Sequence, residues 1–235
     1  TAGGSGSIGI FAQSDAPFTP NNININVDGS VSGGSGDQGT GVQFDNGSAN
    51  TLTVGSEGSI SAASGTAVRF TSASGWPATL AITNNGSING NVDNADGGTV
   101  TGNALVAAAA PAAQAITLDN RGTVAGAAEL DADVRNRGTL EVGQGGTVDR
   151  TVIAGNLEQA ASGSMVVDLD LATRSADTLR VDGDASLDGT VKVRPLSLLP
   201  NRAVDFLSVG GALRGGLAAE ASPIFRYAVQ AAGGT

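Results

Sequence analysis

The sequence predicts an all-β chain that folds as a right-handed parallel β-helix, a solenoid of stacked coils. Gly accounts for 36 of the 235 residues, while charged residues make up 14% and aromatic residues 3%. A chain so poor in Lys and Glu lacks the usual surface helix formers, and its Thr, Ser, Asn and Val favour short strands between turns. The apolar content of 40% is too high for a disordered chain. Because the apolar side chains are mostly small, we expect a narrow, repetitive core.

Three landmarks recur in the same order at nearly one spacing. Gly39–Phe44 (GTGVQF) matches Gly65–Phe70 (GTAVRF) at an offset of 26 residues. The second landmark is Ile25-Asn26-Val27, Leu52-Thr53-Val54 and Leu80-Ala81-Ile82, and the third is Gly29-Ser30-Val31, Gly58-Ser59-Ile60 and Gly86-Ser87-Ile88. A repeat of about 27 residues with three alternating segments is typical of one β-helix coil, which buries its apolar face only by stacking on its neighbours.

Turn residues separate the alternating segments, as in Asp45-Asn46-Gly47-Ser48 and Asn84-Asn85-Gly86. Gly and Asn reach positive φ at least cost, which predicts corners between strands of different sheets. Asn side chains at equivalent corners can also stack their amides in a ladder. We therefore interpret the Asn residues before Gly-Ser and Gly-Thr as structural.

The pattern then becomes less regular. Asn120-Arg121-Gly122-Thr123 and Asn136-Arg137-Gly138-Thr139 repeat at an offset of only 16 residues, which predicts shorter or interrupted coils. The Ala-rich stretch 104–115 is interpreted as a loop on the helix wall, with a short docked helix as the alternative. The chain opens in repeat material, so we expect both of its ends to be boundaries within a longer protein.

Charge and composition exclude several functional classes. The net charge of −10 argues against nucleic-acid binding, because the chain cannot neutralise a row of phosphates. The absence of Cys and His removes the usual zinc, copper, haem and iron–sulfur ligands and the His-dependent nucleophilic triads. Gly33–Asp37 only partly matches a calcium-roll repeat. We expect no cofactor and no metal.

From about residue 151 the sequence pattern changes. Gly155-Asn156-Leu157-Glu158-Gln159 is followed by Gly163–Asp170, and then by Ala176–Val193, which reads ADTLRVDGDASLDGTVKV. This ordered series resembles the C-terminal passenger region of type Va autotransporters, with the pertactin-like passenger and its autochaperone segment as the nearest comparison. The matched motif positions are Gly155, Asn156, Gln159, Asp177, Leu179, Val181, Gly183, Ala185, Leu187 and Gly189. Leu157-Glu158 departs from the more usual Tyr-Thr.

The resemblance implies a protein exported through the periplasm and outer membrane to the bacterial cell surface, linked to a C-terminal outer-membrane barrel that this chain lacks. It also implies that residues 151–235 form terminal coils and an autochaperone-like cap, which templates the coils of residues 1–150 in one elongated domain. The cap segment Leu196–Tyr227 holds Phe206, Phe225 and Tyr227.

The expected function is that of a stalk or adhesin, with a protein or glycan of the host or bacterial surface as its ligand, or of a self-association module. Phe18 and Trp76 lie in Pro-containing loops and are candidate ligand contacts. The alternative is a polysaccharide-acting enzyme, since Asp168 with Asp170, and Asp182 with Asp184 and Asp188, alternate along strands. Such carboxylates more often form the solvated face of a strand, so we expect no enzymatic activity.

Overall fold

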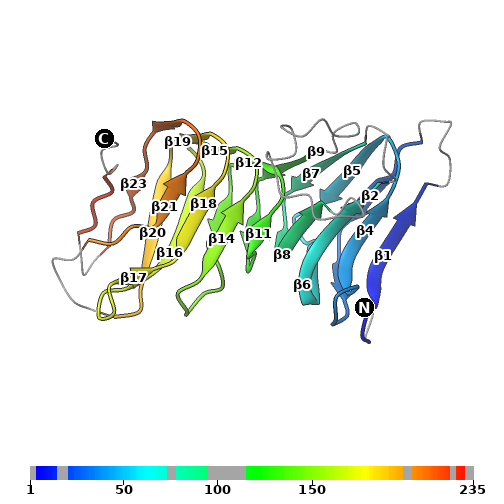
Figure 1. Cartoon of the computed structure of the whole chain (residues 1–235), viewed down its shortest axis with the longest axis horizontal. Helices are drawn as coiled ribbons and strands as arrows, with labels where there is room; N and C mark the ends of the chain where they lie inside the picture. The colour runs from blue at the N-terminus through cyan, green and yellow to red at the C-terminus, as the bar shows by residue number, and fades with distance from the viewer. Residues whose placement is uncertain are drawn as a thin grey trace.

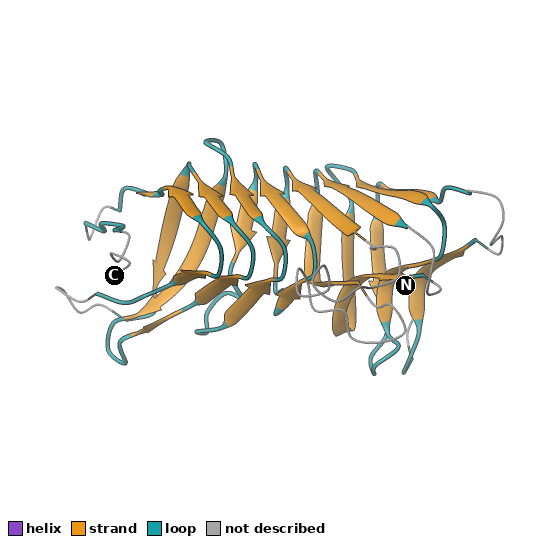
Figure 2. Ribbon diagram, turned by 45° about the horizontal axis from the view of Figure 1, so that its top comes forward, coloured by secondary structure: helices purple, strands orange, loops and turns teal. Residues whose placement is uncertain are grey.

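The chain forms a parallel β-solenoid of about six turns, which confirms the fold class predicted from the sequence. The computed structural model describes residues 4–14, 21–72, 78–94, 115–197, 203–222 and 226–230. The coils follow one another along the long axis from the N-terminus to the C-terminus (Figures 1 and 2). Within these ranges there is no α-helix, and so no helix that could cross a membrane.

One wall of the solenoid, which we call face 1, is an eight-stranded parallel sheet. Its strands occur once per coil and pair in chain order. They are β2 (Asn24–Val27), β5 (Ala49–Val54), β7 (Thr79–Asn84), β9 (Ala115–Asn120), β12 (Asp133–Asn136), β15 (Leu157–Gln159), β19 (Ala185–Leu187) and β22 (Leu213–Gly215).

The other two walls, faces 2 and 3, are joined into one 15-stranded sheet because β6 (Ser59–Thr71) and β8 (Ser87–Asn94) run across both. Face 2 continues through β3 (Ser30–Gly33), β10 (Thr123–Ala125), β13 (Thr139–Glu141), β16 (Ser164–Asp170), β20 (Thr190–Pro195) and β23 (Ala218–Ala219). Face 3 continues through β1 (Ile8–Gln13), β4 (Thr40–Asp45), β11 (Glu129–Leu130), β14 (Arg150–Ile153), β18 (Thr178–Val181) and β21 (Leu207–Val209). The short strand β17 (Ser175–Ala176) instead pairs antiparallel with β16.

The observed registers confirm two of the three sequence landmarks. Phe44 pairs with Phe70, and Ile60 pairs with both Val31 and Ile88. The 16-residue repeat is also one complete short coil, since β9 and β12 are neighbours on face 1.

The second landmark was aligned wrongly by two residues at its last member, although Ile25 pairs with Leu52 as predicted. Leu52 pairs with Ile82 and not with Leu80, which lies opposite Asn50. The period of side-chain direction in a strand is two, so both alignments point the same apolar residues inward. The apolar pattern alone therefore could not distinguish them.

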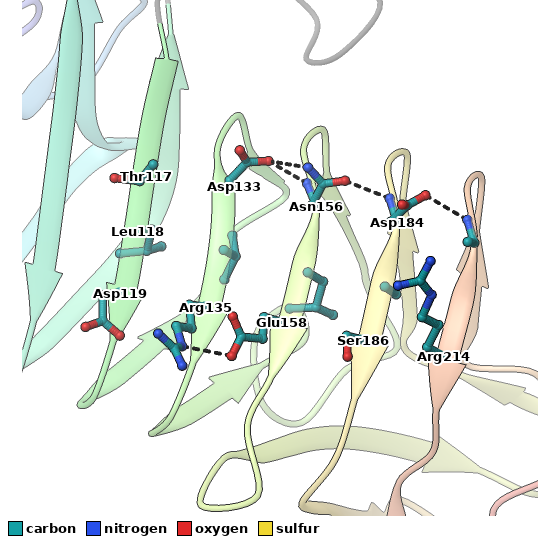
Figure 3. A pocket seen from close by; sticks show the side chains of 14 residues that line it. Thr117, Leu118, Asp119, Asp133, Arg135, Asn156, Glu158, Asp184, Ser186 and Arg214 are labelled. Atoms are coloured by element: carbon teal, nitrogen blue, oxygen red, sulfur yellow. Dashed lines mark hydrogen bonds and ion pairs between the residues drawn. The ribbon is translucent and has the colours of Figure 1, made fainter.

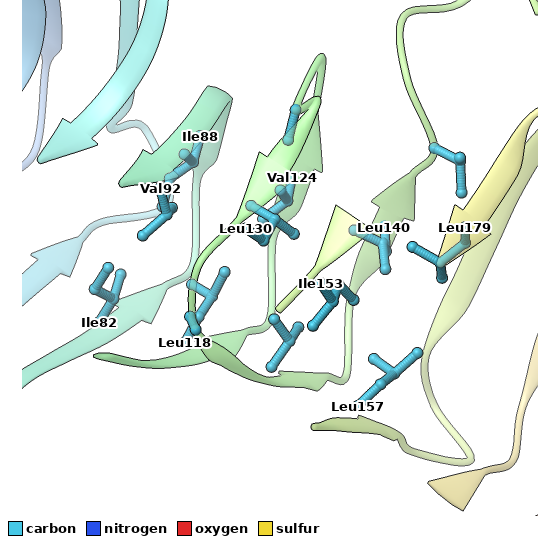
Figure 4. Close-up of a cluster of buried hydrophobic side chains, with 14 of the residues drawn as sticks. Ile82, Ile88, Val92, Leu118, Val124, Leu130, Leu140, Ile153, Leu157 and Leu179 are labelled. Atoms are coloured by element: carbon cyan, nitrogen blue, oxygen red, sulfur yellow. The ribbon is translucent and has the colours of Figure 1, made fainter. Parts of the chain in front are cut away.

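A continuous core of small aliphatic side chains fills the interior. Inward positions of successive coils stack on one another, as Ile88, Val124 and Leu140 do on face 2 in Figure 4. Each of these side chains is almost completely buried. At the C-terminal end Phe206 and Tyr227 pack, partly buried, against this core.

Glycine at the corner between faces 1 and 2 is required by close packing. At Gly86, Gly122 and Gly138 an added Cβ would collide with the carbonyl oxygen of the equivalent glycine one coil earlier. None of the three has a positive φ, so the expectation of positive φ at these corners was wrong. At Asn46 and Gly47 the expectation was right, with φ of 62° and 82°.

Candidate functional site

An open trough of about 600 Å³ runs along the outer surface of face 1 across β9, β12, β15, β19 and β22. Figure 3 shows its side chains in two rows along the solenoid axis. The trough is lined by Thr117, Leu118, Asp119, Asp133, Val134, Arg135, Asn156, Leu157, Glu158, Asp184, Ala185, Ser186, Ala212 and Arg214. Leu118, Val134, Leu157 and Ala185 are buried in the core, so they contribute mainly backbone to its floor.

One row is a ladder of capping side chains. Asp133 Oδ1 accepts hydrogen bonds from the backbone N–H and from Nδ2 of Asn156, at 2.8 and 2.9 Å. Asn156 Oδ1 accepts the N–H of Asp184, and Asp184 Oδ1 accepts the N–H of Ala212, both at 2.8 Å. Each Asp or Asn thus satisfies the first free N–H of the next strand, and Ala212 ends the series because it has no acceptor.

The other row carries longer charged side chains in strict register. Asp119, Arg135, Glu158, Ser186 and Arg214 lie directly opposite one another on successive strands. Arg135 forms an ion pair with Glu158 at 2.9 Å. Ser186 is short, so it leaves a notch between Glu158 and Arg214 (Figure 3).

The trough is polar and mildly acidic. Four carboxylates and two arginines line it. The Arg135–Glu158 pair is about half exposed on both sides, so it orients the two side chains more than it stabilises the fold. Hydrogen-bonding groups of both kinds, aligned along an extended floor, suit a long ligand with many hydroxyl or amide groups.

The autochaperone-like motif positions all lie in the stacked coils. Leu179, Val181, Ala185 and Leu187 are buried in the core. Gly183 has no room for a Cβ because Asn156 Oδ1 lies against it. Two other motif glycines are equally constrained. A Cβ at Gly155 would meet Ala132 and Asp133, and Gly189 has a φ of +78°.

Asp177 of the motif holds two segments together inside the protein. Its side chain is fully buried. Its Oδ1 accepts the backbone N–H of Asp149 and its Oδ2 accepts the N–H of Asp168, both at 2.7 Å. Burial outweighs these hydrogen bonds and raises the pKa of Asp177 above its ordinary value of 3.8. We call this arrangement the Asp177 clamp.

Asp168 does not belong to a solvated strand face, and that interpretation was wrong. The residue is completely buried. Its carboxylate accepts the N–H of Gly146 and forms an ion pair with Arg194, which also pairs with Glu141 at 2.7 Å. The loop before β14 and the side chain of Arg194 therefore cover it.

The other carboxylates that alternate along strands are more exposed than Asp168, and they have different interaction partners. Asp170 accepts a hydrogen bond from the Ser197 hydroxyl, which together with Thr173 lowers its pKa. Asp182 pairs with Arg180, and Asp184 belongs to the capping ladder. Asp188 is exposed. Across the described residues, no group of three or more acidic side chains is placed to hold a metal ion.

The trough was not among the ligand-contact positions predicted from the sequence. Phe18 and Trp76 lie outside the described residues. The trough residues Arg135, Glu158, Ser186 and Arg214 were not singled out, because they come from four coils spaced unevenly along the chain and share no local motif.

Comparison with known proteins adds no relative to this description. No protein-family model matches the chain, and neither a curated protein nor a solved structure matches it.

Proposed function

We propose that this chain is a rigid, surface-displayed segment of an autotransporter passenger that presents the face 1 trough to an extended protein or glycan ligand. The observation that carries the proposal is the unbroken pairing of face 1 from β2 to β22, which aligns side chains from distant coils into one long polar surface. The sequence resemblance of residues 152–193 to autotransporter passengers supplies the cellular context.

Rigidity follows from the way in which the coils join. Every coil is hydrogen-bonded to the next along three faces, and the core is shared by all of them. Repeat proteins of this kind use such extended surfaces for binding. A solenoid therefore serves both as a stalk and as a binding surface.

The binding proposal is tested by blocking the trough. We expect Ser186→Trp to fill the notch on β19 and to reduce binding of the chain to host or bacterial cells and to immobilised glycans. Ser208→Trp is the matched control, because Ser208 is an exposed residue of β21 on face 3. Binding by Ser186→Trp at the wild-type level would show that the trough is not the ligand-binding surface.

Polysaccharide cleavage is the competing outcome of the same assay. We expect binding without turnover. Release of reducing ends that depends on the trough carboxylates Glu158 and Asp184 would instead establish an enzyme.

The C-terminal coils are proposed to template folding as well. The Asp177 clamp joins β16, β17 and the loop before β14 through buried charge-assisted hydrogen bonds, which favours a firm nucleus at this end. After dilution from denaturant, the coils of residues 1–150 should refold much more slowly when residues 151–235 are deleted than in the whole chain. Hydrogen exchange can measure the refolding rate of β4–β8 with and without that segment. Equal rates in the two chains would refute templating.

A further inference from the structure

A ladder of buried amides runs through the corner between faces 1 and 2. Asn84 Nδ2 donates to Asn120 Oδ1 at 2.9 Å, and Asn120 Nδ2 donates to Asn136 Oδ1 at 2.7 Å. Asn136 Nδ2 then donates to Gln159 Oε1 at 2.8 Å. The three Asn side chains are completely inaccessible to solvent, and that of Gln159 is nearly so.

Each Asn of the ladder also grips the strand beyond the corner. The second hydrogen of Nδ2 is donated to the backbone oxygen of Thr123 by Asn84, of Thr139 by Asn120 and of Ser164 by Asn136. One side chain therefore fixes the next coil on both sides of the corner.

Spacing along the chain does not determine this alignment. Successive rungs are 36, 16 and 23 residues apart. The coils that meet at the ladder thus differ more than twofold in length. A constant repeat length therefore cannot determine the register between neighbouring strands.

The apolar core does not determine it either. In β9 the inward residues before Asn120 are Ile116 and Leu118, and in β7 they are Leu80 and Ile82. A slip of two residues would keep aliphatic side chains stacked on aliphatic side chains. It would also place Asn120 beside an aliphatic residue, and a buried amide without a partner is strongly disfavoured.

We propose that the amide ladder from Asn84 to Gln159 sets the register in which these four coils of unequal length stack. Stacked glycines Gly86, Gly122 and Gly138 reinforce it, because a Cβ at any of them would meet the backbone of the neighbouring coil. The ladder ends at Gln159, whose buried Nε2 has no partner, since Leu187 occupies the next coil.

The test moves one rung along its strand and reads the register by disulfide cross-linking. The chain has no cysteine, so introduced pairs report without interference. Asp119→Cys with Arg135→Cys reports the native register, because these residues lie opposite each other. Thr117→Cys with Arg135→Cys reports a two-residue slip, because this diagonal pair is roughly 7–8 Å apart in the native register, too far for a disulfide.

The exchange Leu118→Asn with Asn120→Leu keeps the composition and moves the amide by two residues. We expect the slipped cross-link to exceed the native one, a change on the order of tenfold or more in their ratio. The exchange Ile116→Leu with Leu118→Ile is the control, which moves no amide and should leave the native cross-link alone.

A second variant removes the ladder entirely by the substitutions Asn84→Leu, Asn120→Leu, Asn136→Leu and Gln159→Leu. Because its amides are all replaced by apolar groups, we expect it to give native and slipped cross-links together. The native cross-link alone in both variants, or loss of folding in both without any slipped cross-link, would overturn the proposal. Either result would mean that the amides contribute stability and not register.

Discussion

The N-terminal and C-terminal coils of this solenoid are stabilised by different chemistry. In β4 to β8 most inward positions are apolar, apart from a few buried polar residues such as Asn50 and Asn84, and Phe44 stacks on Phe70 with neither ring exposed. In β14 to β20 the buried carboxylates Asp168 and Asp177 tie loops to strands. Regular coils are therefore held mainly by non-directional packing, whereas the coils with projecting loops combine the same packing with directional polar contacts.

The largest effect should come from the aromatic stack in the N-terminal coils. We predict that Phe70→Ala lowers the free energy of unfolding by about 3–5 kcal/mol, because it leaves a cavity next to Phe44. Hydrogen exchange should quicken in β4–β8 more than in β16–β20, since each coil contacts only its neighbours. Phe11→Ala is the control, as Phe11 is 50% exposed. Uniform faster exchange along the chain would contradict this division.

Breaking the Asp177 clamp should have the next largest effect on stability. This effect should be concentrated in the C-terminal coils and not in β4–β8. We predict that Asp177→Ala costs about 2–4 kcal/mol, because the buried N–H groups of Asp149 and Asp168 lose their acceptors. Exchange should quicken first in β14, β16 and β18. Asp205→Ala removes an exposed carboxylate of the same segment and should change stability by less than about 0.5 kcal/mol. Equal effects of the two substitutions would show that the Asp177 clamp does not stabilise the C-terminal coils.

The same carboxyl group makes a signed prediction about pH. Burial raises the folded-state pKa of Asp177 above its ordinary value of 3.8, so the folded chain binds this proton more tightly than the unfolded chain. The difference in unfolding free energy, wild type minus Asp177→Asn, should therefore fall as pH rises from 3.8 through the folded-state pKa of Asp177. Denaturant titrations across the acid range measure it. A difference that grows with pH would show that the charged form is favoured instead.

The smallest effect is expected on the trough. We predict that Arg135→Ala changes the unfolding free energy by at most about 1 kcal/mol, because the Arg135–Glu158 pair is half exposed. If the trough is the ligand surface, the same substitution should weaken ligand binding measurably. Lost stability with unchanged binding would make the pair a structural element.

Much of the architecture could be predicted from the sequence, because one coil cannot hide its own apolar face. The Val42-x-Phe44 and Val68-x-Phe70 alternation predicted strands that pair in the observed register. The alignment of Leu52 with Leu80 failed because a slip of two residues leaves apolar positions unchanged, and hydrogen bonds decide between the two.

The candidate site was much harder to predict. The motif positions Asp177 and Gln159 could be recognised, but their partners Asp149 and Asn136 are 28 and 23 residues away. Arg135 and Arg214 become members of one trough only after five coils have been stacked. Asp168 was misread because nothing in its own strand reveals that Arg194, on the next coil, covers it.

Distances along face 1 test the stacked architecture most directly. Asn26, Arg135, Glu158, Ser186 and Arg214 belong to one outward row. Spin labels on a cysteine at position 26, paired in turn with a cysteine at each of the other four, can be measured by double electron–electron resonance. We predict four distances that increase in equal steps of about 4.8 Å, because each partner lies one coil further along the axis than the one before it. Distances that do not increase from position 135 to position 214, or steps much larger than the strand spacing, would contradict the solenoid.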